Sequence, residues 1–184
     1  MTTKDAQLDD TLALTGNFSS DDEKFMRRAI ALAHVADSHN EIPVGAVVVC
    51  DGKIVGEGFN QSIMNNDPSA HAEMIAIRDA GNNIANYRLL NCTLYVTLEP
   101  CCMCTGLLVH SRIKQVIFAS DDLKTGAVDS AFTLLNDEKH NHQVTVKSGL
   151  LAEECSTMLS AFFKRRRAEK KAEKQAQKQQ DKNN

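Results

Sequence analysis

The sequence predicts an α/β fold in which two layers of helices cover a central five-stranded mixed sheet. Helical and strand-like segments alternate along the chain between residues 20 and 167. Each helical segment has one apolar face, and that face needs a sheet or another helix to cover it. A chain of 184 residues with 42% hydrophobic content can bury one core, so we expect one domain with short extensions.

The first helix is expected to begin near Ser20, after a flexible N-terminal extension of residues 1–19. The Ser20 hydroxyl can cap the first turn while the Glu23 side chain reaches back to the preceding backbone. Apolar residues then recur at helical spacing, and the helix is expected to end before Pro43.

Two antiparallel strands should follow this helix, over residues 44–49 and 54–59. Asp51 and Gly52 lie between them and suit a tight hairpin turn, because both residue types tolerate the backbone conformation that such a turn needs. The polar residues 60–69 are expected to form a loop.

A second helix is predicted over residues 70–80, and Gly81 suits the left-handed conformation that ends many helices. Residues 92–98 have the composition of a strand. Pro100 follows that strand, and its fixed torsion suits the first turn of a short helix over residues 101–110.

The last part of the domain should contain strands at residues 113–119 and 142–146 and a final helix from Leu150. We expect the domain to span residues 20–167, with 168–184 as a basic polar tail. From Lys164 onward there are nine Lys or Arg against three Asp or Glu, so this end carries +6 and the preceding chain −9. Such a cluster suits phosphate contact, and it equally suits a solvated helix end.

The cysteines indicate a reducing compartment. Cys101, Cys102 and Cys104 lie within four residues, which is too crowded for a simple disulfide framework and typical of a metal site. No stretch reaches the ~20 apolar residues that a membrane span needs, and the first ten residues do not resemble a secretory signal. We therefore expect a cytoplasmic protein without membrane contact.

Four residues form a candidate zinc site. His71 and Glu73 lie in the first turn of one predicted helix, and Cys101 and Cys104 in the first turn of another. Cys101 and Cys104 are separated by one i to i+3 step, so their sulfurs share a helix face. The i to i+2 spacing of Cys102 and Cys104 places those two side chains on different sides, which argues against Cys102 as a ligand.

One histidine and two cysteines leave a fourth tetrahedral position for water, as in catalytic zinc sites. Zinc lowers the pKa of such a water to roughly 7. Glu73 is then expected to move protons from the water to the substrate, and this His-x-Glu with Pro-Cys-x-x-Cys pattern is the signature of zinc nucleobase deaminases. A closed structural site would need a fourth ligand, for which the remaining candidates are His34, His39, His110, His140 and His142.

With these motifs the sequence resembles the bacterial tRNA-specific adenosine deaminases, over about residues 21–167. The stretches that carry the resemblance are residues 42–46 (IPVGA), 58–60 (GFN), 67–73 (DPSAHAE), 86–89 (NYRL), 93–101 (TLYVTLEPC) and 122–127 (DLKTGA). The resemblance implies a cytidine deaminase-like three-layer fold, a homodimer and one Zn2+ per subunit. It also implies that the enzyme converts adenosine to inosine at the wobble position of a tRNA anticodon stem-loop.

The resemblance assigns further roles by position. Asn60 corresponds to a side chain that hydrogen-bonds the base or its ribose, and Val44 to part of the apolar wall against the ring. Ala72 corresponds to a residue whose backbone N–H holds the base edge, and Pro100 to one whose carbonyl receives the leaving amine. The residues that correspond to RNA contacts are Asp122 and Lys124 in a loop and Arg166 and Arg167 on the last helix.

Two alternatives stay open at this point. Deaminases of free cytidine, deoxycytidylate or guanine share the zinc motif, but a small substrate gives no reason for the basic end of the last helix. An RNA-binding module with a purely structural zinc would give no reason for a carboxylate at Glu73. A single-stranded loop is also a favourable RNA substrate, because its bases are already partly unstacked.

Overall fold

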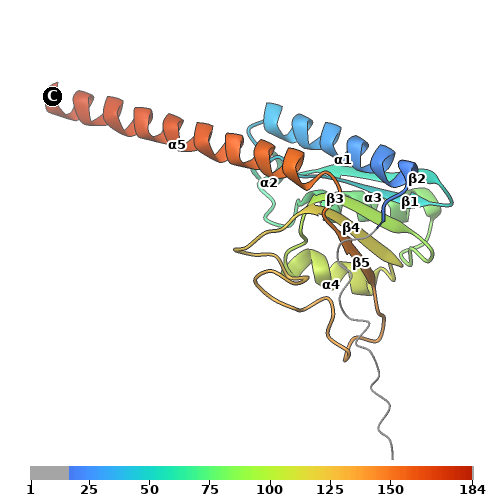
Figure 1. The fold of residues 1–184 in the computed structure, drawn as a ribbon. Coiled ribbons are helices and arrows are strands. Elements are labelled where there is room, and N and C mark those ends of the chain that lie inside the picture. The colour runs from blue at the N-terminus through green and yellow to red at the C-terminus, as the bar shows by residue number, and fades with distance from the viewer. Residues whose placement is uncertain (1–16, 184) are drawn as a thin grey trace, which may run out of the picture.

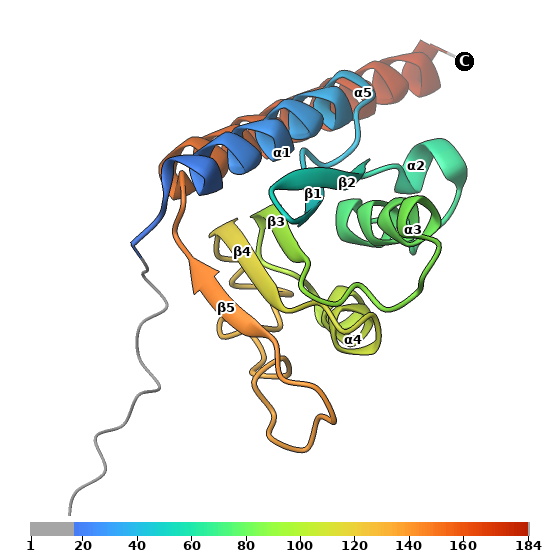
Figure 2. The same ribbon diagram turned by 90° about the vertical axis from the view of Figure 1, so that its right-hand side faces the viewer.

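A computed structural model describes residues 17–183 of the chain, with side chains through Asp181, and most of the expected N-terminal extension lies outside this range. The elements are α1 (Ser20–Ser38), β1 (Gly45–Cys50), β2 (Lys53–Phe59), α2 (Ser62–Asn65), α3 (Ala72–Ile84), β3 (Thr93–Leu98), α4 (Cys102–His110), β4 (Gln115–Ser120), β5 (Thr145–Ser148) and α5 (Ala152–Asn183). Helices α1 and α5 cover one face of the sheet, and α3 and α4 cover the other (Figures 1 and 2). The expected three-layer α/β/α fold is confirmed.

The five strands form one mixed sheet in the order β2-β1-β3-β4-β5. Strand β1 pairs antiparallel with β2 and with β3, whereas the β3–β4 and β4–β5 pairs are parallel. The β1–β2 hairpin turns at Asp51 and Gly52, which both have positive φ, as the sequence predicts. Parallel neighbours need a crossover, and α4 provides it between β3 and β4.

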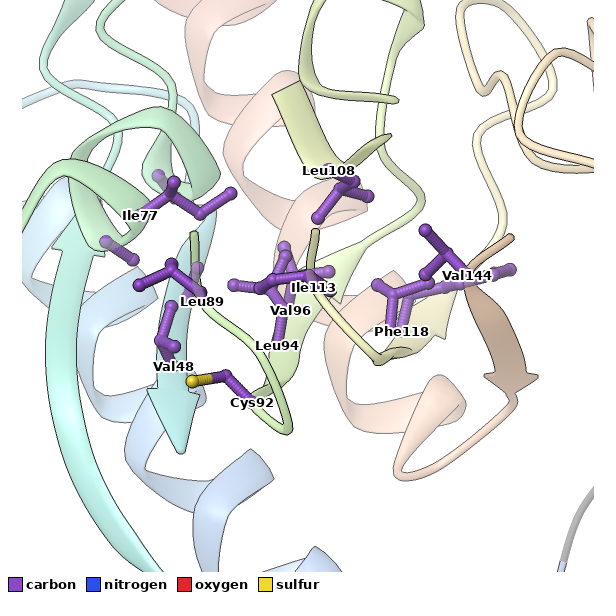
Figure 3. Close-up of a cluster of buried hydrophobic side chains, with 14 of the residues drawn as sticks. Val48, Ile77, Leu89, Cys92, Leu94, Val96, Leu108, Ile113, Phe118 and Val144 are labelled. Atoms are coloured by element: carbon purple, nitrogen blue, oxygen red, sulfur yellow. The ribbon is translucent and has the colours of Figure 1, made fainter. Parts of the chain in front are cut away.

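Each face of the sheet has its own hydrophobic core. The larger core lies under α3 and α4 and includes Leu94, Val96, Leu108 and Phe118, which Figure 3 shows packed between the sheet and the two helices. The other core lies under α1 and α5. β1 and β3 are buried on both faces, which explains their continuous apolar sequences.

Three local expectations were wrong in detail. Helix α1 is capped one residue earlier, by Ser19, whose capping box is completed by Asp22 in place of Glu23. Helix α3 passes through Gly81 and ends at Ala85, which takes the left-handed conformation instead. The loop that the sequence predicted over residues 60–69 contains the one-turn helix α2.

Helix α4 also begins differently from the prediction. Cys101 is its N-cap residue, so Pro100 precedes the helix and does not belong to its first turn. Helix α5 continues without interruption past Arg167, where the sequence placed the end of the domain, and extends away from the sheet (Figure 1). No helix within residues 17–183 combines the length and apolar character needed to cross a membrane.

Candidate active site

The ends of two helices bring the predicted metal ligands together. His71 is the N-cap of α3 and Cys101 the N-cap of α4, while Cys104 lies in the first turn of α4. His71 Nδ1 lies 3.7 Å from the sulfur of Cys101 and 3.7 Å from that of Cys104. The two sulfurs are 3.8 Å apart. The structure therefore groups the two cysteines that the sequence spacing favoured, and Cys102 is exposed outside the group.

These distances fit a tetrahedral zinc ion. Zn–S bonds of about 2.3 Å and Zn–N bonds of about 2.05 Å place two sulfurs about 3.8 Å apart and a sulfur about 3.6 Å from a nitrogen. Within the described residues no further His, Cys, Asp or Glu joins this group of three. None of the five other histidines belongs to this group, so a zinc ion held here would keep its fourth position open.

Hydrogen bonds among these three side chains shift their pKa values even without a metal ion. The hydrogen bond between the sulfurs of Cys101 and Cys104, and the one with His71, lower the pKa of Cys101 to about 4. The hydrogen bond to Cys101 raises the pKa of His71, and the ionised Cys101 raises the pKa of Cys104. A thiolate is therefore present at neutral pH, which is the form that binds zinc.

Glu73 lies in the first turn of α3 and is 4% exposed. Burial raises the pKa of its carboxyl group, because desolvation penalises the charged form. A raised pKa favours the protonated form of this carboxyl group, which suits a side chain that is to accept and release a proton as a general acid–base catalyst.

A cavity of about 190 Å3 is lined by Glu73 and by two of the three metal-site residues, His71 and Cys101. Val44 and Asn60 line it, as the resemblance implies, and Asp122 lines its rim. Residues that the sequence did not single out complete the wall: Glu41, Ile42, Ser62, Ile63, Leu98, Glu99 and Thr125. Helix α2, which no sequence motif indicated, therefore contributes to the site together with the loop after β4, which carries the DLKTGA stretch.

Two of the expected backbone contacts already have partners. The Ala72 N–H donates to Asn60 Oδ1 at 2.9 Å, which fixes the Asn60 amide and differs from the implied contact with a base edge. The Pro100 carbonyl accepts a hydrogen bond of 2.8 Å from the Ala127 N–H. A carbonyl oxygen has two lone pairs, so the Pro100 carbonyl can accept a second donor, whereas the Ala72 N–H has no second proton to give.

The buried carboxylate of Glu99 organises the loop that carries Asp122. Glu99 is 3% exposed and accepts hydrogen bonds from the backbone N–H groups of Asp122, Val128, Asp129 and Ser130, and from the Ser130 hydroxyl. Burial alone would raise the pKa of Glu99, but the hydrogen bonds outweigh burial and hold the pKa below its ordinary value. An acidic residue directly after a buried strand was the available sequence signal for this role.

Glu41 supports the opposite rim of the cavity in the same way. Its side chain is 2% exposed, and Oε1 accepts hydrogen bonds from the N–H groups of Ile63 and Met64. The carboxylate therefore anchors the short helix α2 beside the cavity.

A larger groove of about 580 Å3 adjoins the cavity and shares Ile42, Leu98, Asp122 and Thr125 with it. Lys124 lines the loop side of this groove, and Phe163 and Arg167 line the α5 side. Three of the four residues expected to contact RNA therefore surround one groove. Arg166 is the exception, because it pairs with Glu169 at 2.8 Å and does not line the groove.

Comparison with known proteins gives concordant results. Residues 19–120 match the family described as cytidine and deoxycytidylate deaminase zinc-binding region. A tRNA-specific adenosine deaminase of Haemophilus influenzae is 59% identical over 151 residues, which cover 82% of this chain and 87% of that protein. A solved structure from work on A-to-I editing by tRNA:A34 deaminases has a TM-score of 0.71 and 36% identity, covering 73% of this chain and 98% of that one.

One further structure bears on the alternatives. A guanine deaminase from Bacillus subtilis is 44% identical over 54% of this chain and 64% of its own, with a TM-score of 0.52. The zinc region is therefore similar in enzymes that act on a purine base.

Proposed function

The chain belongs to the family of tRNA-specific adenosine deaminases, and we propose that it uses His71, Cys101, Cys104 and Glu73 to hydrolyse the wobble adenosine of a tRNA anticodon to inosine. It is a zinc-dependent hydrolase that acts on adenosine in tRNA. One observation carries the proposed site: the buried carboxyl group of Glu73 lines the same cavity as two of the three residues whose spacing fits zinc.

The reaction replaces the amino group on C6 of adenine with an oxygen from water and releases ammonia. Zinc, when bound, supplies a Lewis acid that makes water a better nucleophile. Glu73 takes a proton from the water and delivers it to the ring nitrogen, and it then passes the second proton to the departing amine. Burial of the Glu73 carboxyl supports this shuttle, because its raised pKa brings the acid form closer to neutral pH.

The cavity wall positions the base. Val44 is 4% exposed and offers an apolar surface to the ring. With its oxygen held by Ala72, Asn60 can present its NH2 group to an acceptor on the base or ribose. We assign Ala72 the task of orienting Asn60. The Pro100 carbonyl can accept a hydrogen bond from the leaving amine while it keeps Ala127.

The RNA on either side of the reacting adenosine is proposed to lie in the groove between the loop after β4 and helix α5. Asp122 and Lys124 line the loop side, and Arg167 contributes a cation from the helix side. Arg166 can reach phosphate only by opening its ion pair with Glu169, so we assign the larger contribution to Arg167.

Two further proposals concern assembly and location. We propose that the enzyme is a homodimer, which is supported by a second hollow between α3 and α4 beside Tyr87, a side chain that is 69% exposed. Sedimentation at micromolar concentration tests this. A cytoplasmic location is proposed because its tRNA substrate is there and all six cysteines are free thiols.

Inosine formation by zinc-loaded protein tests the function, with a tRNA carrying a wobble adenosine compared against free adenosine, cytidine and guanine. Inosine in the tRNA alone would support the proposal. Turnover of a free base or nucleoside with the tRNA unchanged would overturn it and favour the small-substrate alternative. Glu73→Gln serves as the control that removes the proton shuttle while keeping a side chain of the same shape.

A further inference from the structure

Beyond Arg167, helix α5 continues for about four further turns that carry little apolar surface. Alanine is the only apolar residue type between Arg167 and Asn183. A helix without an apolar face gains nothing from packing on the fold, and in Figure 1 this part extends away from the sheet. Because the fold does not use it, its charges are available to a partner.

The positive charges of this segment lie on one side of the helix. Arg167, Lys170, Lys171, Lys174 and Lys178 recur at intervals of three or four residues, which places them within an arc of roughly 100°. All five are exposed, and they line one shallow hollow on the helix surface together with Gln175. We call these five residues the basic stripe.

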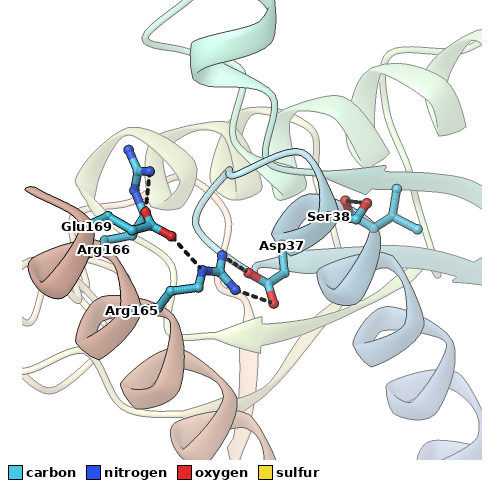
Figure 4. Close-up of polar contacts among 6 residues, drawn as sticks. Asp37, Ser38, Arg165, Arg166 and Glu169 are labelled. Atoms are coloured by element: carbon cyan, nitrogen blue, oxygen red, sulfur yellow. Dashed lines mark hydrogen bonds and ion pairs between the residues drawn. The ribbon is translucent and has the colours of Figure 1, made fainter. Parts of the chain in front are cut away.

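Glu169 is held away from the basic stripe by its ion pairs, and Asp181 lies on the stripe's side of the helix only beyond Lys178. Glu169 lies on another side of the helix and pairs with Arg165 and Arg166, while Arg165 also pairs with Asp37 of α1 at 2.6 Å (Figure 4). Within the described part of the chain, no ion pair involves a member of the basic stripe. Like charges at i and i+4, as at Lys170, Lys174 and Lys178, destabilise a helix unless an anionic partner is present.

The basic stripe is continuous with the active site. The cavity beside Glu73 shares Asp122 with the groove on α5, and that groove shares Arg167 with the hollow that contains the four lysines. From Arg167 to Lys178 the helix rises about 16 Å, which corresponds to roughly five phosphates at 3.4 Å per strand. A macromolecule whose reacting base enters the cavity can therefore place its backbone along the helix.

We propose that the basic stripe binds the phosphate backbone of the helical stem that carries the reacting loop, and so extends the enzyme's contact beyond the anticodon loop. This inference rests on the proposed tRNA substrate. The segment lacks the large apolar side chains that an interfacial membrane helix buries, which favours RNA over a lipid surface. This contact would be independent of the RNA sequence, because lysine–phosphate interactions do not distinguish between bases.

The test compares two full-length variants with the same change in net charge. Lys170→Gln/Lys174→Gln/Lys178→Gln removes three charges from the stripe. Ala172→Glu/Ala176→Glu/Gln180→Glu adds three negative charges on the other side of the helix. Binding is measured in the Glu73→Ala background by fluorescence anisotropy, from about 50 to 200 mM salt, on a stem-loop RNA and on a single-stranded oligonucleotide of the loop alone. Circular dichroism checks that both variants keep the helix.

For the stem-loop, we expect the stripe variant to reduce the slope of log Kd against log salt by about 2 to 3. Each contact with a duplex phosphate contributes about 0.9 to this slope, and three lysines are replaced. The loop oligonucleotide should bind all proteins alike, and the opposite-face variant should retain most of the wild-type slope. Equal losses in both variants would show a general charge effect and overturn the proposal, as would an unchanged slope. Loss of binding to phosphatidylserine vesicles with unchanged RNA binding would overturn it in favour of a membrane surface.

Failure of this inference is distinguishable from failure of the proposed function. Inosine formation by the wild-type enzyme tests the substrate, whereas the salt slope tests the stripe. An enzyme that edits tRNA but shows the same slope in both variants would keep its function and lose the stem contact.

Discussion

Replacing Glu99 with glutamine should loosen the loop after β4 without touching the metal ligands. One carboxylate oxygen accepts the N–H groups of Val128, Asp129 and Ser130, and the other accepts the Asp122 N–H and the Ser130 hydroxyl. A glutamine can present its carbonyl oxygen to the first three donors. Its NH2 group then faces the Asp122 N–H, so one donor loses its acceptor.

The expected cost follows from these contacts. Hydrogen bonds to a charged acceptor are worth about 1.5–3 kcal/mol, and those between neutral groups about 0.5–1.5 kcal/mol. Three bonds weakened by about 1 kcal/mol each, plus an unpaired Asp122 N–H at about 1–3 kcal/mol, give about 4–6 kcal/mol. Removing the charge also removes the cost of burying it, so we expect a net loss of about 3 kcal/mol in the free energy of unfolding.

Urea unfolding at pH 7 measures this loss, and hydrogen exchange at Val128, Asp129 and Ser130 locates it. The pKa of Glu99 is lower in the folded chain than in the unfolded one, so its stabilisation is present above about pH 4.3 and is lost as the pH falls through the folded-state pKa. The difference between wild type and variant should therefore shrink in acid. Glu57→Gln is the control, since it removes a solvent-exposed ion pair with Arg28 and should cost under about 1 kcal/mol. Equal unfolding free energies for wild type and Glu99→Gln would refute the reasoning.

Three further predictions concern the site. Glu73→Gln should keep zinc, as measured by metal analysis, and lose at least about a hundredfold in turnover. In metal-free protein it should also raise the unfolding free energy at neutral pH, because burial raises the folded-state pKa of Glu73 and its stabilisation is lost as the pH rises through that pKa. Cys102→Ser should leave the zinc content unchanged, whereas Cys104→Ser should abolish it; equal zinc in both would contradict the ligand assignment. Arg167→Gln should raise KM for tRNA more than Arg166→Gln, since only Arg167 lines the groove; steady-state kinetics decide between them.

The grouping of the two cysteines was predictable because their spacing at a helix start is a local property. The structure places Cys101 as the N-cap of α4 and Cys104 in its first turn, so Cys101 itself is not helical, and the two sulfurs lie 3.8 Å apart. The hairpin at Asp51 and Gly52 was predictable for the same reason, since its turn chemistry lies within two residues. The three-layer arrangement was predictable because each helix has one apolar face that the sheet must cover.

Features that depend on tertiary contacts could not be predicted. Gly81 is of a residue type that often ends helices, but α3 continues past it to Ile84, and Ala85 takes the left-handed conformation that ends the helix. Helix α2 has no buried residue of its own and depends on the Glu41 carboxylate for its first turn, a contact across about twenty residues of chain. The sequence also could not show which residues of α5 face the groove. Arg166 and Arg167 are neighbours in the sequence, but Arg166 pairs with Glu169 and Arg167 lines the groove.

The family resemblance indicates which positions line the site, but it does not show which group each of them hydrogen-bonds. Ala72 occupies the implied place, but a single N–H cannot serve a base while it donates to Asn60 at 2.9 Å. We therefore propose that the Asn60 NH2 group is the donor that contacts the substrate. Asn60→Asp separates the two assignments, because an aspartate keeps an oxygen for the Ala72 N–H and removes the donor. Strong loss of kcat/KM with retained zinc would support recognition through Asn60, while near wild-type kinetics would return the base contact to the Ala72 backbone.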